Sequence, residues 1–306
     1  MKPTTELHST KPELGRSFAD VLAHSSGSAA GYSANSEWLS CPEKSRLRSL
    51  GIKFRGYEGA GHKTELTALE FGTLIHELLA MRVWYGHDVA VQQLDNWLHE
   101  IGDSHLKAAL MLGTYEQVFP YVSEPLTFLG IESEVVTDIK MGVNDPRPCF
   151  RSVRYDGVVY ASGSPGAEPQ LYSLERKTMS RGGQSALHAY YAQGMVQMGL
   201  WNGNAALVAK YGKMQGVIYE MLVKTKMPSV DRVPVYFSPE QQRLALAYMR
   251  LSENGGVTFV KQADGSYPKL LSSCWGRFSP CDFINLCHEG VTGDYLQDGE
   301  ELEAIP

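Results

Sequence analysis

Glu175 and Lys177 lie two positions apart in the strand-like stretch "LYSLERKT", residues 171–178. Side chains at positions i and i+2 of a β-strand point to the same face, so this acid and this base would share a small volume. Asp156 lies in the preceding strand-like stretch and could share one divalent cation with Glu175. Such a cation polarises a phosphate and activates water, while Lys177 could orient the water or offset charge in the transition state. The residue types fit metal-dependent hydrolysis of a phosphodiester.

Each of these residues also has a purely structural interpretation. A Glu-x-Lys tripeptide in a strand is most often a solvated surface ion pair. His76 lies one turn after Gly72 on an expected helix. A single histidine on an apolar helix face is often a core residue, but its neutral ring nitrogen can also bind a metal. Only the combination of residues is specific.

The elements that would position these side chains can be read from periodicity. Apolar residues recur near the 3.6-residue period over residues 65–84, which predicts a helix. The remaining elements follow in chain order: helices over 89–101 and 105–119, strands over 126–139, 150–161 and 170–178, a helix over 184–201, and strands over 205–211 and 216–224. This order predicts an α/β fold with a mixed central sheet flanked by helices and a helical N-terminal part.

With these elements in place, the chain resembles the PD-(D/E)XK nuclease superfamily, and within it the RecB-like branch that includes CRISPR-adaptation nucleases and many phage exonucleases. The matching segments are "GTLIH" (72–76), "ESEV" (132–135), "YDGVV" (155–159), "LERK" (174–177) and "YYAQGMVQ" (190–197). The resemblance covers roughly residues 36–288 and implies a restriction-endonuclease-like core.

The resemblance also implies roles for individual residues. The implied catalytic residues are Asp156, Glu175, Lys177 and Gln193, and the implied ligands of Mg²⁺ or Mn²⁺ are His76, Glu134, Asp156 and Glu175. Two alternatives stay open. Glu132 shares a face with Glu134 and could replace it, and Gln197 could take the place of Gln193.

The function implied by the family is metal-dependent DNA hydrolysis. An exonuclease acting on DNA ends in recombination, repair or phage replication is expected, with DNA as substrate and a strand-annealing or recombination protein as a partner. The alternatives are a structure-selective or restriction-like endonuclease on the same core and a non-catalytic DNA-binding relative. The intact set of acids and lysine argues against the last alternative.

Five cysteines without an export signal do not predict a disulfide framework. Cys274, Cys281 and Cys287 lie close together in "CWGRFSPCDFINLC", which does not match the spacing of an ordinary zinc ribbon. Several RecB-like nucleases hold an iron–sulfur cluster with one cysteine before the core and three after it. By that resemblance, Cys41 and the late trio are the expected ligands of a [4Fe–4S] cluster, with Zn²⁺ as the alternative.

Charge and composition describe the ends of the chain. The net charge is −6, and the stretch 289–306 holds six acids and no Lys or Arg, so the preceding residues carry 28 acids and 28 bases. A neutral body is compatible with a basic DNA-binding groove. We expect a flexible arm over residues 1–35, a nuclease domain with a cysteine-rich C-terminal segment over 36–288, and an acidic tail over 289–306.

Two further classes of function are not expected. Neither a membrane span nor a secretory signal is present, which predicts a cytoplasmic protein, in the bacterial host if the protein is viral. The stretch "GYEGAGHKT" (56–64) resembles a phosphate-binding loop, but His62 separates Gly61 from Lys63. The motif requires Lys directly after the second Gly, so no ATP binding is expected.

Overall fold

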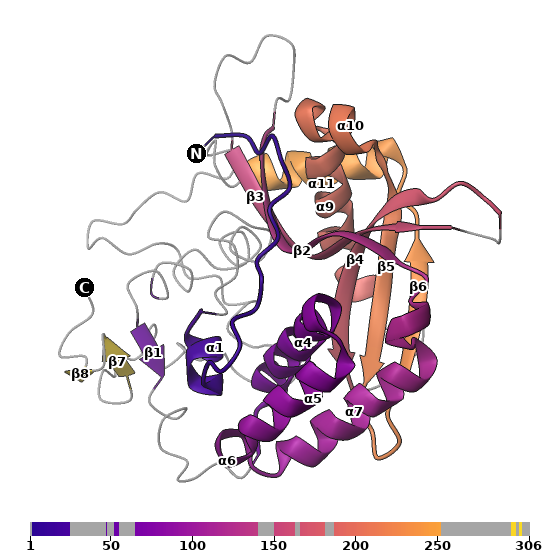
Figure 1. Cartoon of the computed structure of the whole chain (residues 1–306). Coiled ribbons are helices and arrows are strands. Elements are labelled where there is room, and N and C mark those ends of the chain that lie inside the picture. Colours follow the sequence, from indigo (N-terminus) through magenta and orange to yellow (C-terminus); the bar gives the residue numbers. More distant parts are fainter. Residues whose placement is uncertain are drawn as a thin grey trace. The chain divides into compact units, whose positions relative to one another are not determined.

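The computed structural model describes residues 2–24, 47, 52–54, 65–139, 150–162, 166–180, 187–251, 295–297 and 300–301. The chain divides into two compact units, residues 1–31 with 63–247 and residues 32–62 with 248–306. Figure 1 shows the larger unit as a sheet with helices on both faces. No helix among the described residues is both long and apolar enough to span a membrane.

A five-stranded mixed sheet forms the centre of the larger unit, as the sequence predicted. Its strands, in the spatial order β2-β3-β4-β5-β6, are β2 (Thr127–Asp138), β3 (Phe150–Ala161), β4 (Gln170–Met179), β5 (Met214–Val223) and β6 (Ser229–Val235). All neighbouring pairs are antiparallel except β4 and β5, which are parallel. Parallel neighbours need a crossover, and two helices supply it.

A helical layer precedes the sheet in the chain. It consists of α1 (Phe18–His24), α4 (Ala68–Tyr85), α5 (His87–Asn96), α6 (Leu98–Ile101) and α7 (Ser104–Val118). The helix α4 begins with a capping box in which Thr67 and Glu70 satisfy each other's backbone N–H groups. Apolar side chains of these helices form one buried cluster that includes Leu222 of β5 and Val230 of β6.

Two helices, α9 (Tyr191–Asn202) and α10 (Ala205–Tyr211), connect β4 to β5. Alternation along β5 assigns the layers to opposite faces, because Val217 and Tyr219 approach Gly194 of α9 whereas Leu222 packs with the helical layer. The described residues also include the short 3-10 turns η2 (Tyr121–Ser123) and η3 (His188–Tyr190), and α11 (Pro239–Leu251) after the sheet.

The prediction of a strand over residues 205–211 was wrong. These residues form α10, because the Asn204 side chain accepts a hydrogen bond from the Leu207 N–H and caps the helix. Gly212 follows the helix with a φ of 90°, a conformation that favours glycine. Both flanking residues were visible in the sequence and are typical helix boundary signals.

The N-terminal segment is packed on the larger unit, contrary to the flexible arm expected from its composition. Thr4 and Thr10 donate backbone N–H bonds to carbonyls of β2, and Phe18 and Val21 are buried in the helical cluster. This segment, residues 2–24, therefore covers the edge of β2 opposite β3, with which no described strand pairs. The remainder of the range 1–35 lies outside the described residues.

The smaller unit contributes three short described strands, β1 (Ile52–Phe54), β7 (Tyr295–Gln297) and β8 (Glu300–Glu301). They form an antiparallel sheet in the order β1-β7-β8, with Ile52 opposite Gln297. Part of the acidic stretch 289–306 is thus paired with an early strand, a contact that its composition did not indicate. All five cysteines lie outside the described residues.

Candidate active site

The site forms where β3 and β4 stop pairing. Their register ends at Gly157 opposite Leu174, and beyond this point β3 pairs only with β2 while β4 continues beside β5. The Asp156 carboxylate occupies the gap, and its Oδ2 accepts a hydrogen bond of 2.7 Å from the Arg176 backbone N–H. The fork therefore places one carboxylate between two strands, where side chains from both faces can approach it.

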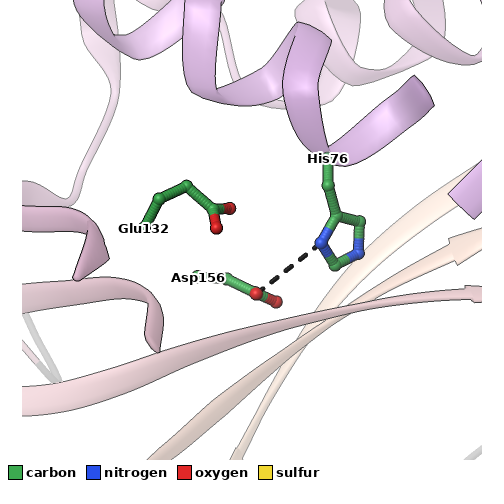
Figure 2. Close-up of side chains that lie close together, drawn as sticks. All are labelled: His76, Glu132 and Asp156. Carbon is green, nitrogen blue, oxygen red and sulfur yellow. Dashed lines mark ion pairs between the residues drawn. The ribbon is translucent and has the colours of Figure 1, made fainter. Parts of the chain in front are cut away.

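His76, Glu132 and Asp156 form a compact group (Figure 2). Each offers one ligand atom, and these atoms lie within 4.8 Å of one another. The His76 Nδ1 atom is 3.6 Å from the Asp156 Oδ1 atom. The close approach of α4 to β4 depends on Gly72, because a Cβ there would lie 3.0 Å from the Thr178 Oγ1 atom. The predicted pairing of Gly72 and His76 on one helix therefore has a packing reason.

The third member of the group is Glu132, whereas the sequence favoured Glu134. Glu132 and Asp156 lie on neighbouring strands, between the register pairs Ile131–Gly157 and Ser133–Tyr155. Its φ of 49° lies in the left-handed region, which costs a non-glycine residue roughly 1 kcal/mol and is typical of functional sites. Glu134 lies opposite Arg154 and is exposed, outside the group.

The electrostatics of the group distinguish its two acids. Burial alone would raise the pKa of Asp156, but the nearby charges of His76 and Lys177 hold this pKa well below its usual range. Burial and the neighbouring Asp156 charge raise the pKa of Glu132 to about 7. For His76, burial lowers the pKa, but Asp156 and Glu132 outweigh it, so the net shift is upward. Because the pKa values of Glu132 and His76 are raised, a cation that binds this group would displace protons from these two residues.

Glu175 and Lys177 lie beside this group, in contact with α9. The Lys177 Nζ atom is 2.5 Å from the Glu175 Oε1 atom and 3.1 Å from the Gln193 Oε1 atom, and it lies over the Tyr190 ring. Burial lowers the pKa of Lys177, but the charges of Glu175 and Asp156 raise it by more. The net shift is upward, so the ammonium stays protonated. The sequence did not indicate the aromatic partner Tyr190.

Both candidate glutamines bind Glu175. The Gln193 Nε2 atom donates to Oε1 at 2.8 Å, and the Gln197 Nε2 atom donates to Oε2 at 2.5 Å. Only Gln193 also contacts Lys177, while Gln197 is fully buried and accepts a hydrogen bond from Ser173. Glu175 lies outside the group of His76, Glu132 and Asp156, and both its oxygens already accept hydrogen bonds. The two glutamines therefore hold the Glu175 carboxylate in place, and this carboxylate in turn holds the Lys177 ammonium.

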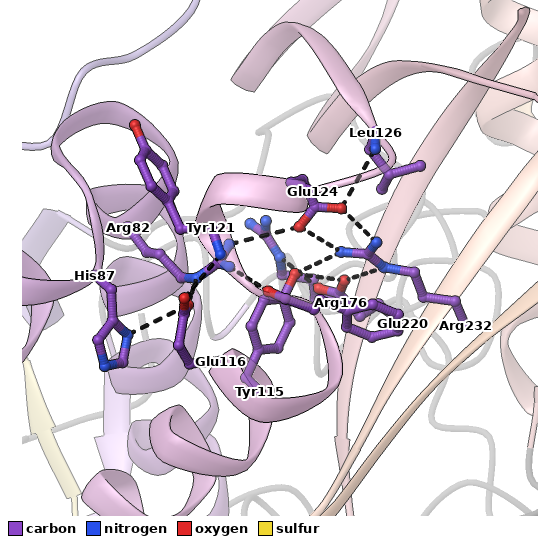
Figure 3. A network of polar contacts seen from close by, with 11 residues as sticks. Arg82, His87, Tyr115, Glu116, Tyr121, Glu124, Leu126, Arg176, Glu220 and Arg232 are labelled. Atoms are coloured by element: carbon purple, nitrogen blue, oxygen red, sulfur yellow. Dashed lines mark hydrogen bonds and ion pairs between the residues drawn. The ribbon is translucent and has the colours of Figure 1, made fainter.

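A buried network of alternating charges supports β4 from the opposite face (Figure 3). Arg176 is completely buried, and its Nε atom donates to Glu220 Oε2 at 2.9 Å. Glu220 also accepts hydrogen bonds from Arg232 and Tyr115, and Arg232 binds Glu124 in turn. This network ties the residue between Glu175 and Lys177 to β5, β6 and α7.

Comparisons with known proteins give weak likenesses. No protein-family model matches the chain, and no curated protein matches it significantly. A solved structure of a candidate exonuclease from Eubacterium rectale is 12% identical, covers 86% of this chain and 89% of its own, and has a TM-score of 0.49. The solved structure of the protein SSO0001 is 12% identical, covers 84% of this chain and 98% of its own, and has a TM-score of 0.31. Neither likeness is strong enough to indicate an activity.

Proposed function

We propose that this protein is a metal-dependent deoxyribonuclease that hydrolyses phosphodiester bonds. One observation carries the proposal: the metal-binding group of His76, Glu132 and Asp156 and the ammonium of Lys177 line the same cavity, contributed by α4, β2, β3 and β4. This combination can bind a divalent cation and still offer a fixed positive charge to a phosphate. It also agrees with the motif order of the PD-(D/E)XK family that the sequence resembles.

The donor atoms fit a divalent cation. His76, Glu132 and Asp156 would hold it, and their ligand atoms already converge without an ion. Two carboxylates suit Mg²⁺ and Mn²⁺, and the imidazole favours Mn²⁺ over the harder Mg²⁺. When bound, the cation supplies polarisation of the scissile phosphate and a lowered pKa for a water molecule. Glu175 is proposed as a further ligand, which requires it to release a hydrogen bond from Gln193 or Gln197.

The protein's own side chains would prepare the remaining chemistry. Lys177 donates from a fixed position toward a phosphate oxygen, because Glu175 and Gln193 hold its ammonium in place. Since its pKa is raised, Lys177 acts as a donor and does not act as a general base. The charges of His76 and Lys177 lower the pKa of Asp156, so this carboxylate is ionised and ready to bind a cation at neutral pH.

The finer assignment is an exonuclease that acts on DNA ends beside a recombination or strand-annealing protein. End-labelled linear DNA and closed circular DNA, each incubated with Mn²⁺, with Mg²⁺ or with a chelator, test this assignment. We expect metal-dependent release of nucleotides from the linear substrate and an intact circle. Cleavage of the circle would assign an endonuclease, and no metal-dependent cleavage of either substrate would refute the proposed function.

We also propose that Cys41, Cys274, Cys281 and Cys287 hold a [4Fe–4S] cluster, although these residues lie outside the described part of the chain. Protein purified without oxygen should be brown and contain iron and sulfide, and Cys281→Ser should lose the colour. Colourless protein with stoichiometric zinc would contradict this assignment.

A further inference from the structure

The cavity at the active site has a volume of about 790 Å³. Its lining includes five basic residues, Lys11, Arg16, Arg154, Arg176 and Lys177, and three acidic residues, Glu77, Glu132 and Asp156. Arg154, Arg176 and Lys177 each form an ion pair with a glutamate. Two of the basic residues, Lys11 and Arg16, belong to the N-terminal segment, which the chemistry described above does not use.

The backbone of the N-terminal segment is held beside the cavity by side chains of the helical layer. The Tyr85 hydroxyl donates to the Pro12 carbonyl at 2.6 Å. The Trp97 Nε1 atom donates to the Arg16 carbonyl at 2.7 Å, and Gln93 accepts the Gly15 N–H at 3.1 Å. These bonds hold the backbone at Pro12, Gly15 and Arg16, and so keep Lys11 and Arg16 at the wall of the cavity.

Within the described part of the chain, Lys11 and Arg16 contact aromatic rings and a backbone carbonyl, and neither has an ion pair. The Lys11 Nζ atom lies 4.7 Å from the centroid of the Tyr85 ring, and the Arg16 Nη2 atom donates to the Asp20 backbone carbonyl at 2.6 Å. An aromatic ring and a carbonyl orient a cation but carry no formal negative charge. Both positive charges can therefore act on an anion in the cavity.

We propose that Lys11 and Arg16 bind backbone phosphates of one nucleic-acid strand next to the scissile bond. The inference rests on the proposed nuclease function and names the residues that hold its substrate. A cavity of this size accommodates a ligand of small-molecule dimensions, which corresponds to a short stretch of a single strand. The N-terminal segment is then part of the substrate site as well as the cover of the β2 edge.

The test uses the full chain and a labelled single-stranded oligonucleotide. Binding is measured by fluorescence anisotropy in a chelator, where no cleavage occurs, over a range of salt concentrations. The double variant Lys11→Ala/Arg16→Ala should bind about tenfold or more weakly, and the slope of log affinity against log salt should shrink by about 1.4, at roughly 0.7 for each lost phosphate contact. In cleavage assays these changes should appear in KM, with kcat little altered.

Lys210→Ala is the matched control. Lys210 pairs with Glu6 at the other end of the same segment and is absent from the cavity lining, so its loss should leave the affinity and the salt slope nearly unchanged. Equal affinities and slopes for the double variant and the wild type would overturn the inference, and so would an equal loss in Lys210→Ala. Thermal unfolding of each variant checks that it is folded. The double variant Lys11→Gln/Arg16→Gln, which removes the charges but keeps long polar side chains, should show the same loss of affinity if the phosphate contacts are the cause. If the variants differ in binding as expected but the wild type does not cleave DNA, the proposed nuclease function is refuted and the inference about binding stands.

Discussion

The backbone nitrogen of Arg176 donates a 2.7 Å hydrogen bond to the carboxylate of Asp156. A side chain of β3 thereby takes a bond that a backbone carbonyl of β3 would accept if the two strands remained paired. The carboxylate both closes the fork between the strands and brings its second oxygen to His76. Asp156 thus contributes both to the stability of the fold and to the proposed metal site, and two substitutions of this residue can separate the two contributions.

Asp156→Asn should abolish metal-dependent cleavage while leaving the fold nearly as stable as the wild type. The asparagine oxygen can still accept the Arg176 N–H, but the charge that attracts a cation is lost. Asp156→Ala should be equally inactive and also less stable by about 1 kcal/mol, because the bond across the fork disappears. Calorimetric titration with Mn²⁺ and urea unfolding measure the two effects. Normal cleavage by either variant would contradict the assigned site.

Lys177→Met should reduce the cleavage rate by about 10² to 10³, an effect similar to the loss of one preorganised donor. Mn²⁺ binding should persist, because His76, Glu132 and Asp156 remain. Gln193→Ala should cause a smaller loss, since it removes only one of the partners that hold Lys177. Single-turnover rates at saturating Mn²⁺ provide the measurement. A Lys177→Met protein with a normal rate would mean that Glu175 and Lys177 form a structural ion pair.

Much of the site could be predicted from the sequence because its residues follow the periods of regular elements. His76 lies on a predicted helix, and Asp156, Glu175 and Lys177 lie on predicted strands. Periodicity could not decide between Glu132 and Glu134, because both lie on one face of β2. The distinction comes from the left-handed backbone at Glu132 and from the position of the fork, and both depend on contacts between distant parts of the chain.

The packing of the N-terminal segment could not be predicted for a related reason. Its composition is polar, and composition predicts disorder when few apolar residues are available for burial. The bonds that hold it join Pro12 to Tyr85 and Arg16 to Trp97, residues far apart in the sequence. Single hydrogen bonds of this kind leave no periodic signal. By contrast, the helix α10 was missed although its capping residue, Asn204, stood in the sequence.

Binding of Mn²⁺ should strengthen as the pH rises from 6 to 8. The pKa of Glu132 is raised to about 7 by burial and by Asp156, so a proton occupies this ligand below neutral pH and must leave when a metal binds. Glu132 alone should change the apparent affinity by about tenfold over this range, and the raised pKa of His76 adds in the same direction. Calorimetry in buffers of different ionisation enthalpy measures both the affinity and the protons released.

Glu132→Gln is the control for this pH dependence. It keeps the shape of the side chain but cannot lose a proton, so Mn²⁺ should bind more weakly and its affinity should vary less with pH. An unchanged pH profile in Glu132→Gln would exclude Glu132 as the titrating ligand and would leave His76 as the ligand whose proton is displaced.

Arg232→Ala should destabilise the protein by roughly 3–5 kcal/mol, because it leaves the buried Glu220 and Glu124 without a main positive partner. Arg176 would then be the remaining arginine bound to Glu220, and β4 would lose part of its support on the face opposite α9. Lys107→Ala, which breaks the exposed pair with Glu65, should cost at most about 1 kcal/mol. Urea unfolding of both variants tests the difference. Similar small losses in the two proteins would mean that solvent reaches the buried network and that it does not hold β4 in place.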